Sequence, residues 1–293
     1  MKRLVALVAS PRKPGNGELF IRAVAKELGT GWELEIIRLI ECDIRPCKAC
    51  YSCLFEKCPQ KDDMQKILSR VVSADAIAVT APTYFLGANS LLKRFIDRGL
   101  MFYSILEKIW GKPMVSVITA GIEGMEGYAK LMVDSAIKIM GGKLLASVVV
   151  YGAFPGEAVL GDQNRDLVQG VANAILSGTS FVPAETSVVC PLCGGDSFRF
   201  LDGSRVRCLL CSNTGHYRIE NGRLAITITP GEHQLFYSLR DALDHAEWLR
   251  TMKKKFLDVR NQLKPVVQEY VKIGRVCHLD DDNAFDKSYT SSY

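Results

Sequence analysis

The first 180 residues alternate short apolar runs with amphipathic segments, and this alternation limits the possible fold more than any other feature of the sequence. It is typical of β-α-β units, in which helices cover the faces of a parallel sheet. Candidate strands cover residues 3–9, 33–39, 76–81, 114–119 and 144–151. Candidate helices cover residues 17–28, 63–73, 88–100, 124–140 and 162–176. We therefore expect an α/β fold with a doubly wound, five-stranded parallel sheet that binds ligands at the carboxyl ends of its strands.

The sequence changes character near Pro183, where two CxxC pairs and short β-like runs follow the last helix. After about residue 234, apolar residues recur at helical spacing, and the chain ends in a polar stretch. We predict four parts: the α/β domain (1–182) with a cysteine loop (42–60), a metal-stapled ribbon unit (183–231), a helical segment (232–277) and a flexible tail (278–293).

No segment of the sequence predicts export or a membrane span. The amino-terminal apolar run is short, lacks a cleavage signature and is expected to form the first buried strand. No stretch approaches the roughly 18 to 20 apolar residues that a membrane helix needs. We expect a cytoplasmic protein with no membrane partner, in which clustered thiols hold metal more often than they form disulfides.

The loop S10-P-R-K-P-G-N-G17 follows the first candidate strand and leads into a helix. Backbone N–H groups and the positive end of the helix dipole can bind a phosphate there, with Ser10, Arg12 and Asn16 as further donors. The loop lacks both a Walker A ending and a full G-x-G-x-x-G pattern, which argues against an NTPase and a standard NAD fold. The alternative is a plain turn between strand and helix.

Two later loops are expected at the same edge of the sheet. In A81-P-T-Y-F-L-G87, Tyr84 and Phe85 could flank a flat ring. In T119-A-G-I-E-G124, glycines allow close approach of the backbone. Three such loops at one edge predict a mononucleotide site, and a flavin is its natural occupant.

The loop S-x-R-x-x-G-N, the segment P-T-Y-F with L92-K-R-F-I-D-R98 after it, and the compact cysteine run resemble the NADPH-dependent FMN reductase superfamily. Within it, they resemble the iron-sulfur flavoproteins. The resemblance covers about residues 1–180 and implies a flavodoxin-like fold. It departs at Gly17, where relatives usually carry Ser or Thr. The implied FMN site comprises residues of the three loops: Ser10, Arg12, Gly15, Asn16, Gly17, Pro82, Thr83, Tyr84, Phe85, Thr119, Ala120 and Gly121.

The cysteine loop carries Cys47, Cys50, Cys53 and Cys58 in the pattern C-x2-C-x2-C-x4-C. Thiolates three residues apart on a turning loop can bind different corners of an iron-sulfur cubane. The run resembles the compact motif with which iron-sulfur flavoproteins hold a 4Fe-4S cluster. A zinc site and free thiols are the alternatives. We expect Cys42, just upstream, to be a buried thiol that ends a strand.

The ribbon unit carries Cys190, Cys193, Cys208 and Cys211 as two CxxC pairs separated by fourteen residues. This spacing is a strong signal for a structural zinc site, because two knuckles can close a tetrahedral shell. The C-P-x-C-G knuckle also occurs in rubredoxin, so mononuclear iron is the alternative. We expect His216 to be a surface residue, since four cysteines complete the shell.

These features predict an FMN- and 4Fe-4S-containing oxidoreductase. Its partners would be a ferredoxin-like one-electron carrier, NAD(P)H or a small reducible substrate. The resemblance implies a homodimer or homotetramer, and no catalytic acid or base is assigned. The alternatives are a cluster-free NAD(P)H-dependent FMN or quinone reductase, and a redox-sensing module that binds protein or nucleic acid. Nucleic acid is not favoured, because residues 184–230 carry five arginines against four carboxylates.

Overall fold

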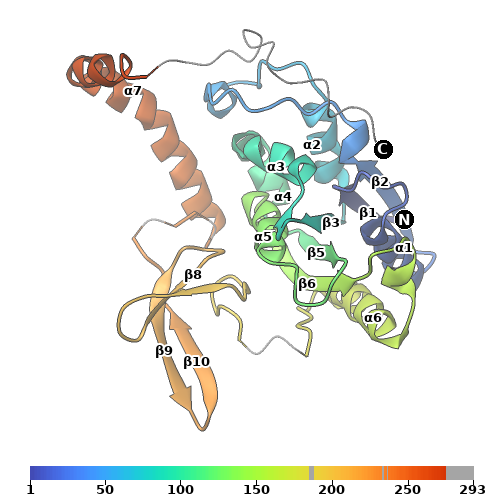
Figure 1. Cartoon of the computed structure of the whole chain (residues 1–293). Coiled ribbons are helices and arrows are strands. Elements are labelled where there is room, and N and C mark those ends of the chain that lie inside the picture. Colours follow the sequence, from blue (N-terminus) through green and yellow to red (C-terminus); the bar gives the residue numbers. More distant parts are fainter. Residues whose placement is uncertain (185–187, 233, 236, 275–293) are drawn as a thin grey trace, which may run out of the picture. The chain divides into compact units, whose positions relative to one another are not determined.

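The computed structural model describes residues 1–184, 188–232, 234–235 and 237–274, and it contains the predicted parallel sheet (Figure 1). The predicted tail (278–293) lies outside the described residues. The sheet runs in the order β2-β1-β3-β5-β6, which is the flavodoxin-like order, with its switch point between β1 and β3. Its strands are β1 (Lys2–Val8), β2 (Trp32–Arg38), β3 (Ala76–Tyr84), β5 (Pro113–Ala120) and β6 (Lys143–Tyr151).

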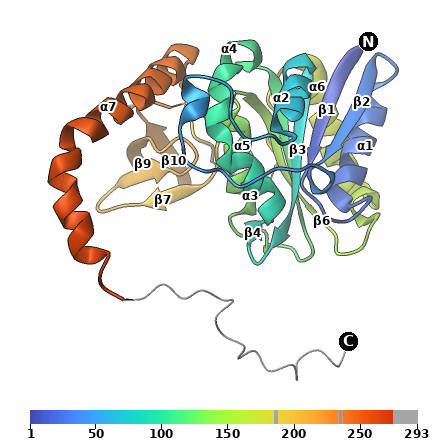
Figure 2. The same ribbon diagram turned by 90° about the horizontal axis from the view of Figure 1, so that it is seen from above.

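Helices cover both faces of the sheet and bury one apolar core on each side (Figure 2). The central strands are almost continuously apolar because both of their faces are covered. One face packs against α1 (Asn16–Leu28) and α6 (Asp162–Ser177). The other packs against α2 (Met64–Ser73), α3 (Ser90–Asp97), the short α4 (Leu106–Ile109) and α5 (Ala129–Ile139). The predicted α/β class is confirmed.

The helix predicted over residues 88–100 is shorter in the structure. The chain first forms a tight hairpin between β3 and β4 (Gly87–Ala88), and Asn89 then caps α3 by accepting the backbone N–H of Leu92. After Asp97 the chain continues as the 3-10 helix η3 (Gly99–Ser104). Residues 88–100 therefore contain the end of β4, the N-cap of α3, α3 itself and the start of η3.

The helix predicted over residues 124–140 begins five residues later, at Ala129. Gly124 and Gly127 have φ of 73° and 56°, a left-handed conformation that is incompatible with the first turns of a right-handed helix. The segment before α5 is thus a loop at the carboxyl edge of the sheet, which lengthens the predicted loop after β5.

The ribbon unit forms a separate antiparallel sheet, as expected from its short strands. A turn at residues 220–223 joins β9 and β10, with Asn221 and Gly222 at φ of 50° and 74°. Two left-handed residues in a row are what a two-residue hairpin with matching twist requires. The strands are β7 (Phe198–Phe200), β8 (Arg205–Cys208), β9 (Thr214–Glu220) and β10 (Arg223–Ile228).

Among its described residues, the predicted helical segment (232–277) contains one long helix, α7 (Leu239–Tyr270), which includes Pro265. The chain divides into two compact units, Met1–Glu247 and Trp248–Tyr293. The proposed boundaries at 182 and 231 within the first unit stay predictions. Within the described ranges, no helix has both the length and the apolar character that a membrane span requires.

Candidate active site and metal centres

The loop between β1 and α1 gathers polar groups at the carboxyl edge of the sheet. The Ser10 hydroxyl accepts the backbone N–H of Arg12 at 3.2 Å, and Arg12 Nη1 donates to the carbonyl of Ala153 at 2.8 Å. Helix α1 starts at Asn16, and the first N–H groups of a helix have no partner within it. The loop therefore offers the donors and the helix dipole that bind a phosphate.

The amide of Asn16 is already used by the protein. Its Nδ2 donates to the carbonyl of Gly152 at 2.9 Å, and its Oδ1 accepts the backbone N–H of Gly156 at 2.9 Å. The sequence suggested that this amide contacts the phosphate directly. In the structure it ties the loop before α1 to the loop after β6, so it shapes the site through the backbone.

Two glycines of this loop are required by packing. A Cβ at Gly15 would lie 2.6 Å from Ser10 Oγ, and a Cβ at Gly17 would lie 2.0 Å from Thr80 Oγ1. Thr80, on β3, thus fills the space of a side chain at position 17. This accounts for glycine where Ser or Thr was expected from the family pattern.

The predicted loops meet around one pocket of about 240 Å³. All of the predicted flavin-site residues except Gly17 and Phe85 line it, and Gly152 and Ala153 complete it from the loop after β6. These two residues were missed from the sequence, although they directly follow a predicted strand at the ligand-binding edge. The lining residues are Ser10, Arg12, Gly15, Asn16, Pro82, Thr83, Tyr84, Thr119, Ala120, Gly121, Gly152 and Ala153.

The end of β3 lines the pocket, whereas the hairpin tip that follows it points into solvent. Thr83 Oγ1 is buried without a hydrogen-bond partner among the described residues, and Tyr84 lines the pocket with its side chain half exposed. Phe85 has a φ of 48° at the hairpin tip and is fully exposed. The unpartnered Thr83 hydroxyl and the backbone of Gly121 can bind the polar edge of a flat ring. Phe85 does not line the pocket.

The cysteine loop leaves the sheet at the end of β2 and turns sharply around its thiols. Ala49 and Tyr51, on either side of Cys50, have φ of 49° and 58°, a strained conformation for residues with side chains. Such strain is typical of functional loops. Cys53 and Cys58 pack against the core, and Cys47 and Cys50 are exposed.

The thiols of this loop differ in environment. Burial, reinforced by Cys58, raises the pKa of Cys53, and hydrogen bonds from Ser52 lower the pKa of Cys50. Among the described residues, these sulfurs do not form a group close enough for a single ion. A cubane separates its thiolates more widely, because each one binds a different iron atom. Four thiols on one loop are a donor set that fits an iron-sulfur cluster.

Cys42 lies outside this set. It is half-buried against the core and contacts the carbonyl of Arg38 through its sulfur at 3.5 Å. Burial raises its pKa, which keeps the thiol protonated. Cys42 therefore packs against the core, but it is only partly buried and follows a 3-10 turn (Leu39–Glu41) after β2, so it does not end the strand as expected.

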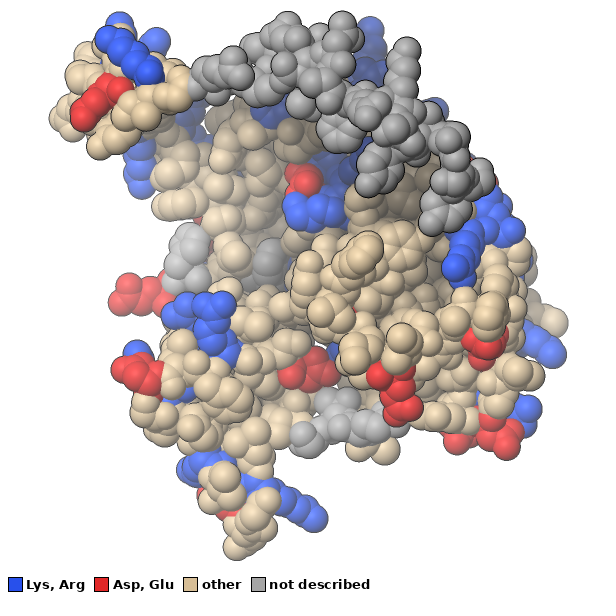
Figure 3. All heavy atoms as spheres, viewed as in Figure 1, with Lys and Arg blue, Asp and Glu red and all other residues tan. Residues whose placement is uncertain are grey.

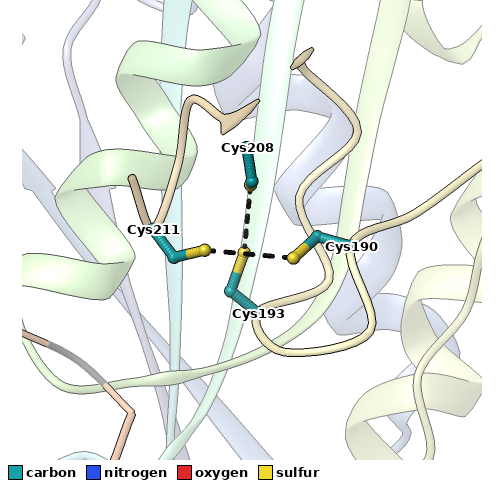
Figure 4. A group of neighbouring side chains, drawn as sticks. All are labelled: Cys190, Cys193, Cys208 and Cys211. Atoms are coloured by element: carbon teal, nitrogen blue, oxygen red, sulfur yellow. Dashed lines mark hydrogen bonds between the residues drawn. The ribbon is translucent and has the colours of Figure 1, made fainter. Parts of the chain in front are cut away.

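The four cysteines of the ribbon unit converge on one point (Figure 4). Their sulfurs lie within 4.8 Å of one another, with Cys190 and Cys211 at 3.9 Å and Cys193 and Cys208 at 3.5 Å. Four sulfurs at about 2.3 Å from one ion stand about 3.8 Å apart, so the spacing fits a tetrahedral metal shell. His216 lies outside it, exposed and hydrogen-bonded to the Ser204 hydroxyl at 3.1 Å.

Two knuckles of matching form present these sulfurs. After the second cysteine of each pair the chain turns left-handed, at Gly194 (φ 75°) and at Ser212 (φ 60°). Each turn is closed by a backbone N–H that donates to the carbonyl of the first cysteine, at 2.9 Å in both knuckles.

Hydrogen bonds among the four crowded thiols shift their pKa values in opposite directions. Hydrogen bonds from the neighbouring thiols lower the pKa of Cys190 and Cys211, and the reverse contacts raise the pKa of Cys193 and Cys208. Four thiols brought to one point are a ligand set for a metal cation, which binds them as thiolates.

Comparison with known proteins agrees with this geometry. The family model described as NADPH-dependent FMN reductase matches residues 2–156, which is more than half of the chain. An iron-sulfur flavoprotein of Archaeoglobus fulgidus is 32% identical over 165 residues, which cover 55% of this chain and 82% of the relative. Another, of Methanocaldococcus jannaschii, is 38% identical over 101 residues, which cover 33% of this chain and 51% of the relative.

A solved structure of similar fold is a flavone reductase, with a TM-score of 0.69 and 18% sequence identity. The similarity covers 94% of this chain and 99% of that one, and at this identity it shows the fold alone. Fold, pocket and family match together define a flavin-dependent oxidoreductase. The chain belongs to the NADPH-dependent FMN reductase family and, within it, to the iron-sulfur flavoproteins.

Proposed function

We propose that this protein is an oxidoreductase that holds FMN in the pocket at the carboxyl edge of its parallel sheet and a 4Fe-4S cluster in its cysteine loop. The observation that carries the proposal is the convergence of four separate loops on one pocket, with the cysteine loop leaving the same edge after β2. FMN would supply one- and two-electron chemistry, and the cluster would supply one-electron chemistry.

The residues of the pocket divide into two roles under this proposal. Ser10, Arg12 and the first turn of α1 bind the phosphate through N–H, O–H and guanidinium donors. Thr83 and the backbone near Gly121 bind the polar edge of the ring, since the Thr83 hydroxyl has no protein partner among the described residues. None of these groups needs to transfer a proton, so no acid or base is assigned.

Cys47, Cys50, Cys53 and Cys58 are the proposed cluster ligands. The two half-buried cysteines anchor one side to the core, and the two exposed cysteines present the other side to solvent. A cluster placed in this way is accessible to an external one-electron carrier. We therefore infer a ferredoxin-like carrier or NAD(P)H as electron partner, with a small reducible substrate at the flavin and assembly into a homodimer or homotetramer.

We assign Cys190, Cys193, Cys208 and Cys211 to a structural zinc ion. Their sulfurs are largely buried in the apolar core of the ribbon unit, which includes Val206 and Ile228. A closed shell of four thiolates leaves no open position for substrate, which is typical of a structural site. Mononuclear iron fits the same four sulfurs and would be distinguished by metal analysis.

The nucleic-acid alternative gains no support from the face of the molecule shown in Figure 3. On the face shown in Figure 3, the described lysines and arginines are interspersed with carboxylates and do not form one continuous basic patch. Tight binding to a polyanion requires several cations that act together.

Anaerobic purification with quantitation of flavin, iron, sulfide and zinc tests the proposal. We expect about one FMN, four iron atoms, four sulfides and one zinc per chain. Cys50→Ser should lose the iron and sulfide and keep the FMN and zinc, and Cys42→Ser, the matched control, should keep all four. A preparation that holds FMN and zinc without sulfide would instead support a cluster-free reductase.

A further inference from the structure

Arg98 is the largest side chain that is completely buried in the described part of the chain, and it lies beside the cysteine loop. It follows the last residue of α3 and pairs with Asp62, and each of the two side chains is only 1% exposed. Burial of two charges is costly unless their remaining hydrogen bonds are satisfied. The hydrogen-bond partners of Arg98 and Asp62 therefore indicate the role of this buried ion pair.

The Arg98 guanidinium contacts the cysteine loop at both ends. Its Nη1 donates to the carbonyl of Arg45, two residues before the first cysteine, at 3.1 Å and also to Asp62. Its Nη2 donates to the sulfur of Cys58, the last cysteine, at 3.3 Å and to Met101 Sδ at 3.2 Å.

Asp62 forms further hydrogen bonds where the cysteine loop begins and ends. Its carboxylate accepts the backbone N–H groups of Arg45 at 3.2 Å and Met64 at 3.3 Å. Beside it, the backbone N–H of Asp43 donates to the Asp63 carboxylate at 2.8 Å, and that of Asp63 donates to the carbonyl of Asp43 at 2.9 Å. The two segments that enter and leave the loop are thus fixed to each other, and Arg98 links them to the Cys58 sulfur.

We propose that Arg98 is a positioning residue for an iron-sulfur cluster in the cysteine loop, and that its N–H group at the Cys58 sulfur raises the reduction potential of that cluster. This inference rests on the proposed function, which makes Cys58 a ligand. A donor at a ligand sulfur stabilises the added negative charge of the reduced cluster. Asp62 acts in the opposite direction, because its carboxylate offsets the guanidinium charge.

Arg98→Lys and Asp62→Asn test these two effects, with Arg94→Lys as the matched control on the exposed side of the same helix. Iron, sulfide and FMN are quantified, and the cluster midpoint potential is measured by redox titration followed by electron paramagnetic resonance. We expect Arg98→Lys to shift the potential negative and Asp62→Asn to shift it positive, each by about tenfold in the one-electron equilibrium, or about 59 mV. Arg94→Lys should leave it unchanged.

The outcomes separate this inference from the proposed function. Opposite shifts in the two variants support the inference, as does loss of iron with FMN retained in Arg98→Lys. Unchanged iron content and potential in both variants would overturn it while leaving the proposed cluster in place. Loss of FMN together with iron in Arg98→Lys would also overturn it, because the pair would then support the whole domain. A wild-type protein without sulfide would overturn both proposals.

Discussion

Lys130 of α5 and Asp196 of the ribbon unit form a salt bridge, with 2.8 Å between Nζ and Oδ2. Both side chains are mostly buried, at 17% and 20% exposed, so solvent screens the pair less than a surface pair. Leu131, next to Lys130, packs against the apolar core of the ribbon unit. The metal-stapled sheet is therefore attached to the α/β domain through α5.

This salt bridge should stabilise the attachment. We expect Lys130→Met to lower the free energy of unfolding by about 1–3 kcal/mol, because it leaves a partly buried carboxylate without its partner. A double-mutant cycle with Asp196→Asn, measured by urea denaturation, should give a coupling energy of about 1 kcal/mol. Strictly additive effects of the two substitutions would show that the contact contributes nothing.

The Asp134 carboxyl, which lies near Lys130 and accepts the Ser147 hydroxyl at 2.7 Å, should make stability depend on pH. Burial raises its pKa above the ordinary 3.8 in spite of Lys130, with Asp196 adding to the rise. The unfolded chain therefore ionises this group at lower pH than the folded protein does. Its stabilising contribution is complete below pH 3.8 and is lost as the pH rises toward the folded pKa.

Asp134→Asn removes this titration and keeps an acceptor for Ser147. The free energy of unfolding of the variant relative to wild type should rise as the pH increases from about 3.8 to about 7. Urea denaturation at the two pH values checks this. A difference that stays constant, or that falls with increasing pH, would contradict it.

Gly17→Ser should damage the loop before α1, although the family resemblance implies a hydroxyl at that position. The new Cβ would lie 2.0 Å from Thr80 Oγ1, and overpacking of this kind costs about 1–3 kcal/mol. We expect lower FMN content and a lower melting temperature. Thr80→Ala in the same chain should restore both, and if the double variant is no better than Gly17→Ser alone, Thr80 is not the obstacle.

Loss of the metal from the ribbon unit should unfold that unit and spare the parallel sheet. Zinc contributes about 10–16 kcal/mol to small four-ligand domains, far more than the small core around Val206 can supply. In Cys208→Ser, hydrogen exchange should accelerate over β7 to β10, and the flavin spectrum should persist. Exchange that stays slow over these strands would mean that the metal is not structural.

The sequence predicted the parallel sheet and the grouping of the four ribbon cysteines, because both leave local signals, whereas the cluster assignment of the cysteine loop stays a prediction. Continuous apolar runs indicate buried parallel strands, and CxxC spacing indicates knuckles irrespective of the surrounding fold. The late start of α5 could also have been read from the sequence, since Gly124 and Gly127 mark a loop.

Other features depend on contacts between distant segments. Asn16 forms hydrogen bonds with Gly152 and Gly156, which lie about 140 positions away in the sequence. Arg98 donates a hydrogen bond to Cys58, which lies 40 positions away. Nothing local to Arg98 distinguishes it from the exposed Arg94 four residues earlier. Phe85 turns outward because of a left-handed hairpin tip, which apolar character alone does not predict.

Anaerobic titration with a one-electron reductant, followed by absorption, tests the central claim most directly because it counts redox centres. Bound FMN and one 4Fe-4S cluster predict uptake of about three electrons per chain, two by the flavin and one by the cluster. Cys50→Ser should take up about two. Uptake of only two electrons by the wild-type protein, with no signal from a reduced cluster, would contradict the account and leave a cluster-free flavin reductase.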